Sequence, residues 1–272
     1  MIEVVDRVPT YPNRVKITKS NGSSEFVTWE RADEPTVPGT PINKALFDSI
    51  AQDIGLATDM TVYVSRAGSD ALGTGTSAQP FATINKALSV LPKNLNGYTA
   101  YVSIAGGTYP EKVLVNGFAN GEIRFTGAAG STVTITKLTV NQTALFSCQT
   151  IQLYLATGNE DSVALDVTGN SYATFGELVT ISGSQSGVVS REESRVRFTN
   201  LTANNVKGAA VYANGGRVHA QLLAGSGNDV AINANRGGVA TYETMTLTSA
   251  VKYYASNGGR IYSGSQTNIP VY

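Results

Sequence analysis

The sequence predicts an all-β protein whose body is a single-stranded parallel β-helix, with three strands per coil and coils of 21–23 residues. The first observation is a motif, Ala-Asn-Gly-Gly-Arg-Val at 213–218, that returns in closely related form at 234–239 and 256–261. The second is that apolar positions keep the same interval further back in the chain. Repeats of this length are too short for helix pairs or propeller blades, which leaves a stacked coil.

Three apolar columns define the predicted register. Each column contributes one short strand to every coil, and Gly, Asn or Ser separates neighbouring strands. Strands of successive coils then lie about 4.8 Å apart, as in any parallel sheet. The columns are Ala173, Val196, Val218, Val239 and Ile261; Val167, Val189, Val211, Ile232 and Tyr254; and Leu178, Leu201, Leu223 and Met245.

Residues 1–58 differ from the rest and are predicted to form a separate attachment segment, a hairpin plus a helix. Residues 15–18 and 26–29 flank an Asn-Gly pair at 21–22, which is a strong hairpin signal. A Pro-rich link at 35–41 follows. Thr40 and Pro41 are typical of a helix start, and Gly55 is typical of a helix end.

Residues 59–116 are predicted to form the cap and the first coils, and residues 117–272 the body. A strand at 62–65 is followed by a Gly-rich loop at 68–76. A short helix then opens near Pro80, and its apolar residues keep the i, i+3, i+4, i+7 spacing of a one-sided helix. These are Ile84, Ala87, Leu88 and Leu91.

Two resemblances bear on identity. The order of strand, Gly-rich loop, short helix and Gly-Gly-Thr-Tyr-Pro-Glu at 106–111 resembles the start of pectate-lyase-like β-helix proteins. That resemblance implies a right-handed coil whose open first turn is covered by the helix. Residues 7–15, 31–36 and 39–44 resemble the amino-terminal attachment regions of tail-fibre and tailspike-like proteins from phages and prophages of Gram-positive bacteria.

The second resemblance implies a place and partners for the protein. It implies a virion component of the phage tail that is assembled in the bacterial cytoplasm as a homotrimer. Residues 1–58 would join it to other tail or baseplate proteins, and its body would bind a host cell-surface glycan. A bacterial surface adhesin is a further alternative.

Composition argues against several other classes of function. The 20 basic and 20 acidic residues leave no net charge, so no basic face for nucleic acid is expected. The single cysteine, Cys148, excludes an intrachain disulfide and a multi-cysteine zinc site, and we expect it in the core. The amino terminus lacks a signal-peptide pattern, and no stretch approaches the roughly 18 apolar residues of a membrane span. We expect no cofactor and no membrane partner.

Catalysis by such a coil would need paired groups on its outer wall. Glycosidases hold two carboxyl groups about 5–9.5 Å apart, and a Ca²⁺-dependent lyase needs clustered acidic ligands. Neither pattern is present in the predicted register, in which Asp166 aligns with Val188 and no metal site forms. Asp166, Glu177 and His219 are the candidate catalytic residues if the alternative holds, namely a polysaccharide lyase or glycoside hydrolase with a site between subunits. The sequence favours a binding scaffold.

Candidate binding residues lie toward the carboxyl terminus. Tyrosine combines a flat apolar ring with a hydroxyl, which suits sugar stacking. The predicted carbohydrate-binding residues are Tyr242, Tyr253, Tyr262, Arg217 and Arg260. Arg195, Arg217 and Arg260 are expected to share one column with Gly238 in the gap, and Tyr254 is expected to point inward and close the last coil. Asn214, Asn235 and Asn257 are expected to stack as a structural ladder of amides.

Overall fold

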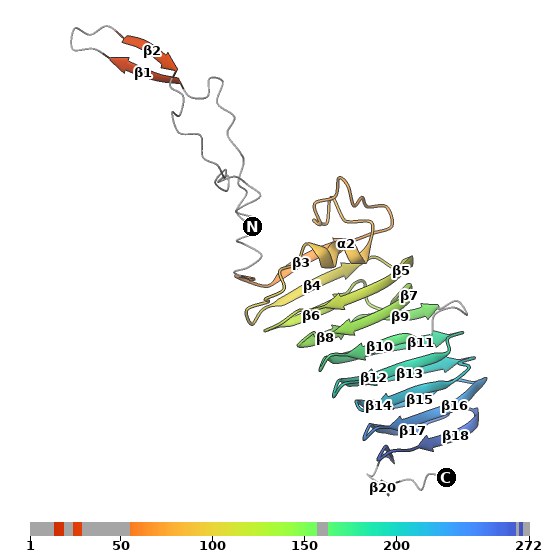
Figure 1. Ribbon diagram of the computed structural model, residues 1–272. Coiled ribbons are helices and arrows are strands. Elements are labelled where there is room, and N and C mark those ends of the chain that lie inside the picture. The colour runs from red at the N-terminus through yellow and green to blue at the C-terminus, as the bar shows by residue number, and fades with distance from the viewer. Residues whose placement is uncertain (1–13, 19–23, 29–54, 157–162, 265–266, 269–272) are drawn as a thin grey trace. The chain divides into compact units, whose positions relative to one another are not determined.

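The computed structural model describes residues 14–18, 24–28, 55–156, 163–264 and 267–268 (Figure 1). The chain divides into two units, residues 1–54 and residues 55–272. In the first unit, β1 (Arg14–Thr18) and β2 (Ser24–Thr28) pair antiparallel on either side of the Asn-Gly pair. The helix expected after Pro41 lies outside the described residues.

The second unit is a parallel β-solenoid of about seven coils. Figure 1 shows its strands stacked one above another as successive rungs. Each coil contributes one strand segment to each of three walls, so the predicted count of three strands per coil is confirmed. Several long strands bend at a bulge and pass from one wall to the next, as β11 does between Phe175 and Leu178.

The three walls are built as follows. The first wall contains β3 (Met60–Val64), β4 (Thr99–Ile104), β6 (Glu122–Thr126), β8 (Leu145–Cys148), the first halves of β11 (Tyr172–Ser182), β13 (Arg195–Asn204), β15 (Arg217–Ala224) and β17 (Val239–Met245), and β19 (Arg260–Ser263). The second wall contains the first halves of β5 (Gly107–Asn116) and β7 (Ser131–Asn141), then β9 (Ile151–Ala156) and the second halves of β11, β13, β15 and β17. The third wall contains the second halves of β5 and β7, then β10 (Val163–Thr168), β12 (Ser186–Arg191), β14 (Ala209–Asn214), β16 (Asn228–Asn235) and β18 (Ser249–Ala255). A short strand, β20 (Thr267–Asn268), pairs antiparallel with β19.

The first predicted column is correct in three coils and then shifts by one residue. Ala173, Val196 and Val218 pair in succession, but Val218 pairs with Ala240 rather than with Val239. Asn235 and Ala240 lie five positions apart, whereas their partners Asn214 and Val218 lie four apart, and Arg236 in the longer corner is in the left-handed conformation with a φ of 51°. A repeated motif marks each corner, but the number of residues in the corner decides which side chain faces inward.

The second predicted column mixes inward and outward positions. Val211 pairs with Ile232 as predicted, and the next inward residue in that column is Tyr253. Tyr254 lies beside it, pairs with Asn233 and is 47% exposed, so the prediction that Tyr254 closes the last coil is wrong. A shift of one residue moves a strand side chain to the opposite face.

The third predicted column is correct from its second member onward. Leu201, Leu223 and Met245 pair in succession. Leu201 pairs with Val179 rather than with Leu178, because the bulge in β11 inserts one extra residue before this point. Coil length is also less uniform than predicted, since the paired residues Phe146 and Ala173 lie 27 positions apart.

The core is a continuous interior column that runs through the coils. Phe125, Phe146, Phe175 and Phe198 pack ring against ring, with centroids 4.9–5.7 Å apart. Aromatic pairs at such distances contribute about 0.5–1.5 kcal/mol beyond the area that they bury. Cys148 lies in the same interior, as expected, and burial raises the pKa of its thiol to about 12, so the thiol stays protonated.

The predicted capping helix is present as α2 (Ile84–Ser89). Thr83 caps its first turn by accepting a hydrogen bond from the Lys86 amide at 3.1 Å. The Glu111 carboxylate, from β5, accepts the amides of Ile84 and Asn85 at 2.9 and 3.0 Å. The apolar face of the helix is buried, so it covers the first coil as the sequence indicates.

Candidate functional site

The described residues enclose a groove on the outer face of the first wall. Two adjoining cavities of about 450 and 390 Å³ make up this groove, and together they extend from β11 to β19. They share His219, Val239, Thr241 and Glu243. The groove therefore crosses several coils along the stacking direction, rather than lying within one coil.

Strand alternation places the polar side chains in this groove. In β13, Val196 and Phe198 are buried while Arg195 and Arg197 lie on the opposite face and are exposed. The parallel register then stacks Arg195 next to Arg217, and Arg197 next to His219. The same periodicity that builds the core thus aligns a cationic row on its outside.

The charge of the groove is positive. Three arginines and one glutamate line it, which leaves two positive charges when His219 is neutral. Among the described residues, no ion pair involves Arg195, Arg197 or Arg217. A chain with 20 basic and 20 acidic residues has thus concentrated unpaired cations on one surface.

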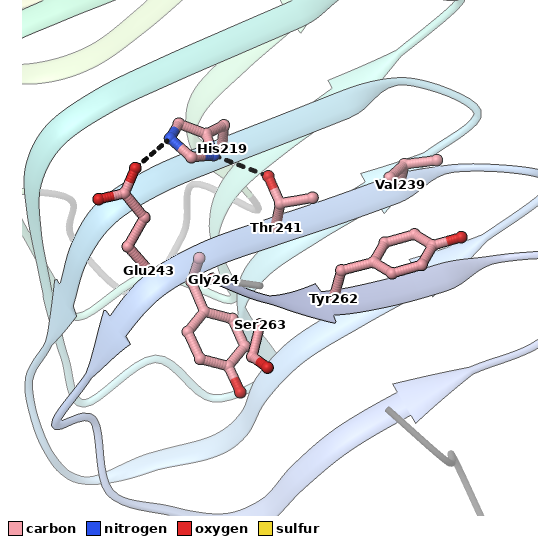
Figure 2. Close-up of a pocket in the computed structure, with 8 residues that line it drawn as sticks. His219, Val239, Thr241, Glu243, Tyr262, Ser263 and Gly264 are labelled. Carbon is pink, nitrogen blue, oxygen red and sulfur yellow. Dashed lines mark hydrogen bonds and ion pairs between the residues drawn. The ribbon is translucent and has the colours of Figure 1, made fainter. Parts of the chain in front are cut away.

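His219 is held between two side chains of the next coil, as Figure 2 shows. Its Nδ1 lies 2.8 Å from the Thr241 hydroxyl, and its Nε2 lies 3.6 Å from a Glu243 carboxylate oxygen. The Thr241 hydroxyl also donates to the Val218 carbonyl, at 3.5 Å.

The protonation of His219 follows from its surroundings. Burial lowers its pKa, the nearby Arg197 lowers it further, and Glu243 partly opposes both effects. The imidazole is therefore neutral near pH 7. Glu243 itself is half exposed, with 52% of its side chain accessible.

Aromatic rings lie at the two ends of the groove. Tyr172, in β11, is 39% exposed and pairs with Arg195. Tyr262, in β19, pairs with Thr241 and lines the other end, where Figure 2 shows its ring beside Thr241. An exposed ring next to polar groups is a surface on which a sugar ring can stack.

Tyr242 and Tyr253 are placed differently from the other predicted binding residues. Tyr242 lies in an inward column, next to Ala220, and is 8% exposed. Its ring stacks on that of Tyr253, with centroids 6.1 Å apart and planes inclined by 15°, and the two hydroxyls bond to each other. The pair packs at the carboxyl-terminal end of the interior, and Tyr242 also lines the cavity of about 390 Å³.

The remaining predicted residues are dispersed. Arg217, Tyr262 and His219 line the groove, whereas Arg260 is exposed on β19 without lining either cavity. Val239, not Gly238, occupies the gap between Arg217 and Arg260 in their column. The structure does not bring Asp166, Glu177 and His219 together.

Asp166 lies on the third wall, in β10. It pairs with Val189 rather than with Val188, and its carboxylate lies 3.3 Å from Nε of Arg191. The two facing atoms are buried and do not have hydrogen-bond geometry. Burial raises the pKa of Asp166, and the attraction of Arg191 and Lys137 offsets this only in part. Glu177 lies in β11, in the bulge where that strand bends.

The three asparagines of the repeat make unequal contacts. The Asn257 amide donates to the Asn235 amide oxygen at 3.0 Å, as in a ladder. Asn214 is in register with Asn235, but its amide oxygen is buried without a hydrogen-bond partner. A second contact of this kind, which the sequence analysis missed, joins Asn141 to Asn116 at 2.8 Å.

Sequence reasoning missed four residues of the groove: Tyr172, Arg197, Thr241 and Glu243. Glu243 lies in β17, two residues after Thr241. It contacts His219 on the diagonal, two residues away, and long side chains on neighbouring strands reach such diagonal partners. A search of diagonals as well as columns would have found the pair.

The described part of the chain contains no group of three or more His, Cys, Asp or Glu side chains that could hold a metal ion. Within the same residues, no helix is long and apolar enough to cross a membrane.

No protein-family model, no curated protein and no solved structure matches this chain. The class of the protein therefore follows from its own architecture. It is an all-β parallel β-solenoid with one short helix in its described part, consistent with a pectate-lyase-like fold.

Proposed function

We propose that this protein is a polysaccharide-binding solenoid of a phage or prophage tail fibre or tailspike. The observation that carries the proposal is the groove on the first wall, which continues across coils from β11 to β19. A groove that follows the stacking direction accommodates a linear polymer, with Tyr172 and Tyr262 at its ends as stacking surfaces and arginines between them as hydrogen-bond donors.

The attachment role is assigned to residues 1–58, whose stretches 7–15, 31–36 and 39–44 resemble tail attachment regions. In this proposal the chain assembles as a homotrimer and joins another tail or baseplate protein through that segment. Three grooves on one assembly would bind one polymer-covered surface together, and linked sites raise overall avidity by about 10²–10⁴.

The direct test is binding of the purified full-length protein to wall polysaccharides and capsules of Gram-positive bacteria, measured by calorimetry or cosedimentation. Tyr172→Ala and Tyr262→Ala should each weaken binding about tenfold, since a lost aromatic stacking contact costs about 1–3 kcal/mol. Tyr254→Ala is the matched control, because Tyr254 is 47% exposed on the third wall, outside the groove.

Two outcomes would contradict the proposal. Equal binding by Tyr172→Ala, Tyr262→Ala and the unaltered protein would show that the groove is not the site. A monomer in sedimentation equilibrium would contradict the tail assembly, for which a trimer is expected.

Cleavage of a polysaccharide is the second candidate, favoured by the His219 and Glu243 pair. A neutral imidazole has one ring nitrogen that can accept a proton, as a general base must. However, Glu243 is the one carboxylate that lines the groove in the described residues, whereas glycosidases of either stereochemistry use two. Binding is therefore the primary proposal.

The two candidates separate on product formation. Incubation with the bound polysaccharide should release no reducing ends and no unsaturated product if the groove only binds. Sustained release that His219→Gln abolishes, with binding retained, would establish the enzyme instead.

A further inference from the structure

Three arginines lie on neighbouring positions at one end of the groove. Arg195 and Arg217 are paired residues of neighbouring strands, and Arg197 lies two positions along from Arg195 on the same face. Their Cα atoms are therefore separated by roughly 5 and 7 Å. Like charges at such distances repel, and no acidic side chain in the described residues pairs with any of the three.

One of these charges lies beside His219 in the groove. Arg197 pairs with His219 in the next coil and lines the same cavity, and its charge helps to lower the pKa of the histidine. Glu243 is the one acidic side chain lining the groove in the described residues, and it contacts His219. Among the described residues, none therefore neutralises the three arginines by an ion pair.

Guanidinium groups in this arrangement favour a particular ligand chemistry. Each one offers planar, paired donors that match the geometry of a carboxylate or a phosphate, and hydrogen bonds between charged groups are about twice as strong as neutral ones. Tyr172 adds a ring surface directly beside Arg195. A ligand that uses both the guanidinium groups and the Tyr172 ring must therefore carry anionic groups and sugar rings.

We propose that the groove recognises a polyanionic polysaccharide, with Arg195, Arg197 and Arg217 binding its carboxylate or phosphodiester groups and Tyr172 stacking on an adjacent sugar. This inference rests on the proposed function and specifies its ligand class.

A nucleic acid is the other polyanion to consider. Its affinity comes chiefly from many phosphate contacts distributed over a broad basic surface. Here the cations are three arginines in one groove of a chain with no net charge, and a glutamate lies beside them. The arrangement therefore favours the polysaccharide.

The test compares charged polymers with their neutral counterparts on the full-length protein. The anionic polymers are polygalacturonate, polyglycerol phosphate and dextran sulfate. The neutral polymers compared with them are carboxyl-reduced polygalacturonate, an uncharged glucan and dextran, respectively. We expect the protein to bind at least one of the natural anionic polymers more than tenfold tighter than its neutral counterpart. Preference for polygalacturonate identifies a carboxylate ligand, and preference for polyglycerol phosphate identifies a phosphodiester.

Substitutions then test whether Arg195, Arg197 and Arg217 bind the polymer. Arg195→Gln, Arg197→Gln and Arg217→Gln should each weaken the binding of the anionic polymer about tenfold, and each should reduce its dependence on salt. Arg260→Gln is the matched control. It removes an exposed arginine of the same outer column, in β19, that lines neither cavity, and it should leave affinity unchanged.

Each result bears on one proposal. Equal affinity for the charged and neutral polymers would overturn the polyanion inference and leave polysaccharide binding standing. Binding of single-stranded DNA as tightly as any polysaccharide would overturn the assignment of ligand class. Failure to bind any polymer would overturn the proposed function together with this inference.

Discussion

The early and late coils of the solenoid are built differently. From β6 to β13 the interior holds four packed phenylalanine rings, whereas from β15 onward the corresponding inward positions hold Ala220 and then Tyr242. The end structures differ too, since α2 and its hydrogen-bonded loop cover the first coil and a stacked tyrosine pair fills the last. Large apolar side chains therefore fill the early coils, whereas much of the groove lies on the outside of the late coils.

The corners show the same division. One corner column runs through Thr143, Ser171 and Ser194 in the early coils and continues as Gly216 and Gly238 in the late ones. In the early coils the buried Ser171 and Ser194 hydroxyls accept the backbone amides of Thr143 and Ser171, their neighbours in the preceding coils, at 3.0 Å in both cases. In the late coils the glycines allow close approach of the backbones instead. Side-chain hydrogen bonds support the early corners, and absence of a side chain supports the late ones.

The largest expected effect sharpens the comparison of the two interiors. Phe175→Ala should lower the free energy of unfolding by about 4 kcal/mol, because it leaves a cavity between two other rings. Tyr242→Ala removes a ring from the same inward column at the end of the stack, where local opening is easier, and should cost less. Denaturant titration of both variants measures the difference. A greater cost for Tyr242→Ala would show that the late coils, not the early ones, hold the fold together.

The second prediction concerns the glycine corners. Gly238→Ala should cost about 3 kcal/mol, since the added Cβ would overlap the carbonyl oxygen of Ala213 in the coil before it. Gly176→Ala is the control, because the nearest atom to its added Cβ is 3.6 Å away. The thermal unfolding midpoints of the two variants should therefore differ clearly. Similar midpoints would show that the late corners accommodate the added methyl group without a loss of stability.

The third prediction tests the hydroxyl corners. Ser171→Ala should cost about 2 kcal/mol, because it leaves the buried Thr143 amide without its acceptor. Ser103→Ala, on the outer face of β4, should be close to neutral. Hydrogen exchange at the Thr143 amide gives a local reading, and unchanged protection there would refute the role assigned to the Ser171 hydroxyl.

The smallest expected effect is the pH dependence due to Asp166. Its pKa is raised in the folded state, so the native protein holds this proton more tightly than the unfolded chain does. Its contribution to stability is therefore present below the unfolded pKa, which is about 4, and is lost as the pH rises through the folded pKa. Measured against Asp166→Asn, the unaltered protein should lose relative stability as the pH rises above about 4. A relative gain would show that attraction to Arg191 outweighs burial.

Much of the fold could be predicted because the interval of the repeat is written directly in the sequence. The coil, its three strands and the capping helix at Ile84 each follow from local patterns of apolar residues, Gly and Asn. The register could be predicted only approximately. The one-residue difference in length between the corners after Asn214 and after Asn235, and the bulge in β11, each displace the pairing by one position, and neither changes the local pattern enough to be recognised.

The candidate site depended on that register. Arg217, Tyr262 and His219 could be selected from residue type and outward alternation, and all three line the groove. Glu243 could not be selected as the partner of His219, since the contact is diagonal. Tyr242 was selected for its chemistry, yet the register turns it inward.

The sequence by itself determined the repeating coil, because one residue in two must be apolar for a strand to bury one face, and the interval between turns sets where the next strand begins. Only the tertiary structure decided which side chains meet across coils, because a one-residue change at a corner exchanges the inner and outer faces. The cationic row of Arg195, Arg197 and Arg217 beside the His219 and Glu243 pair is a product of that stacking.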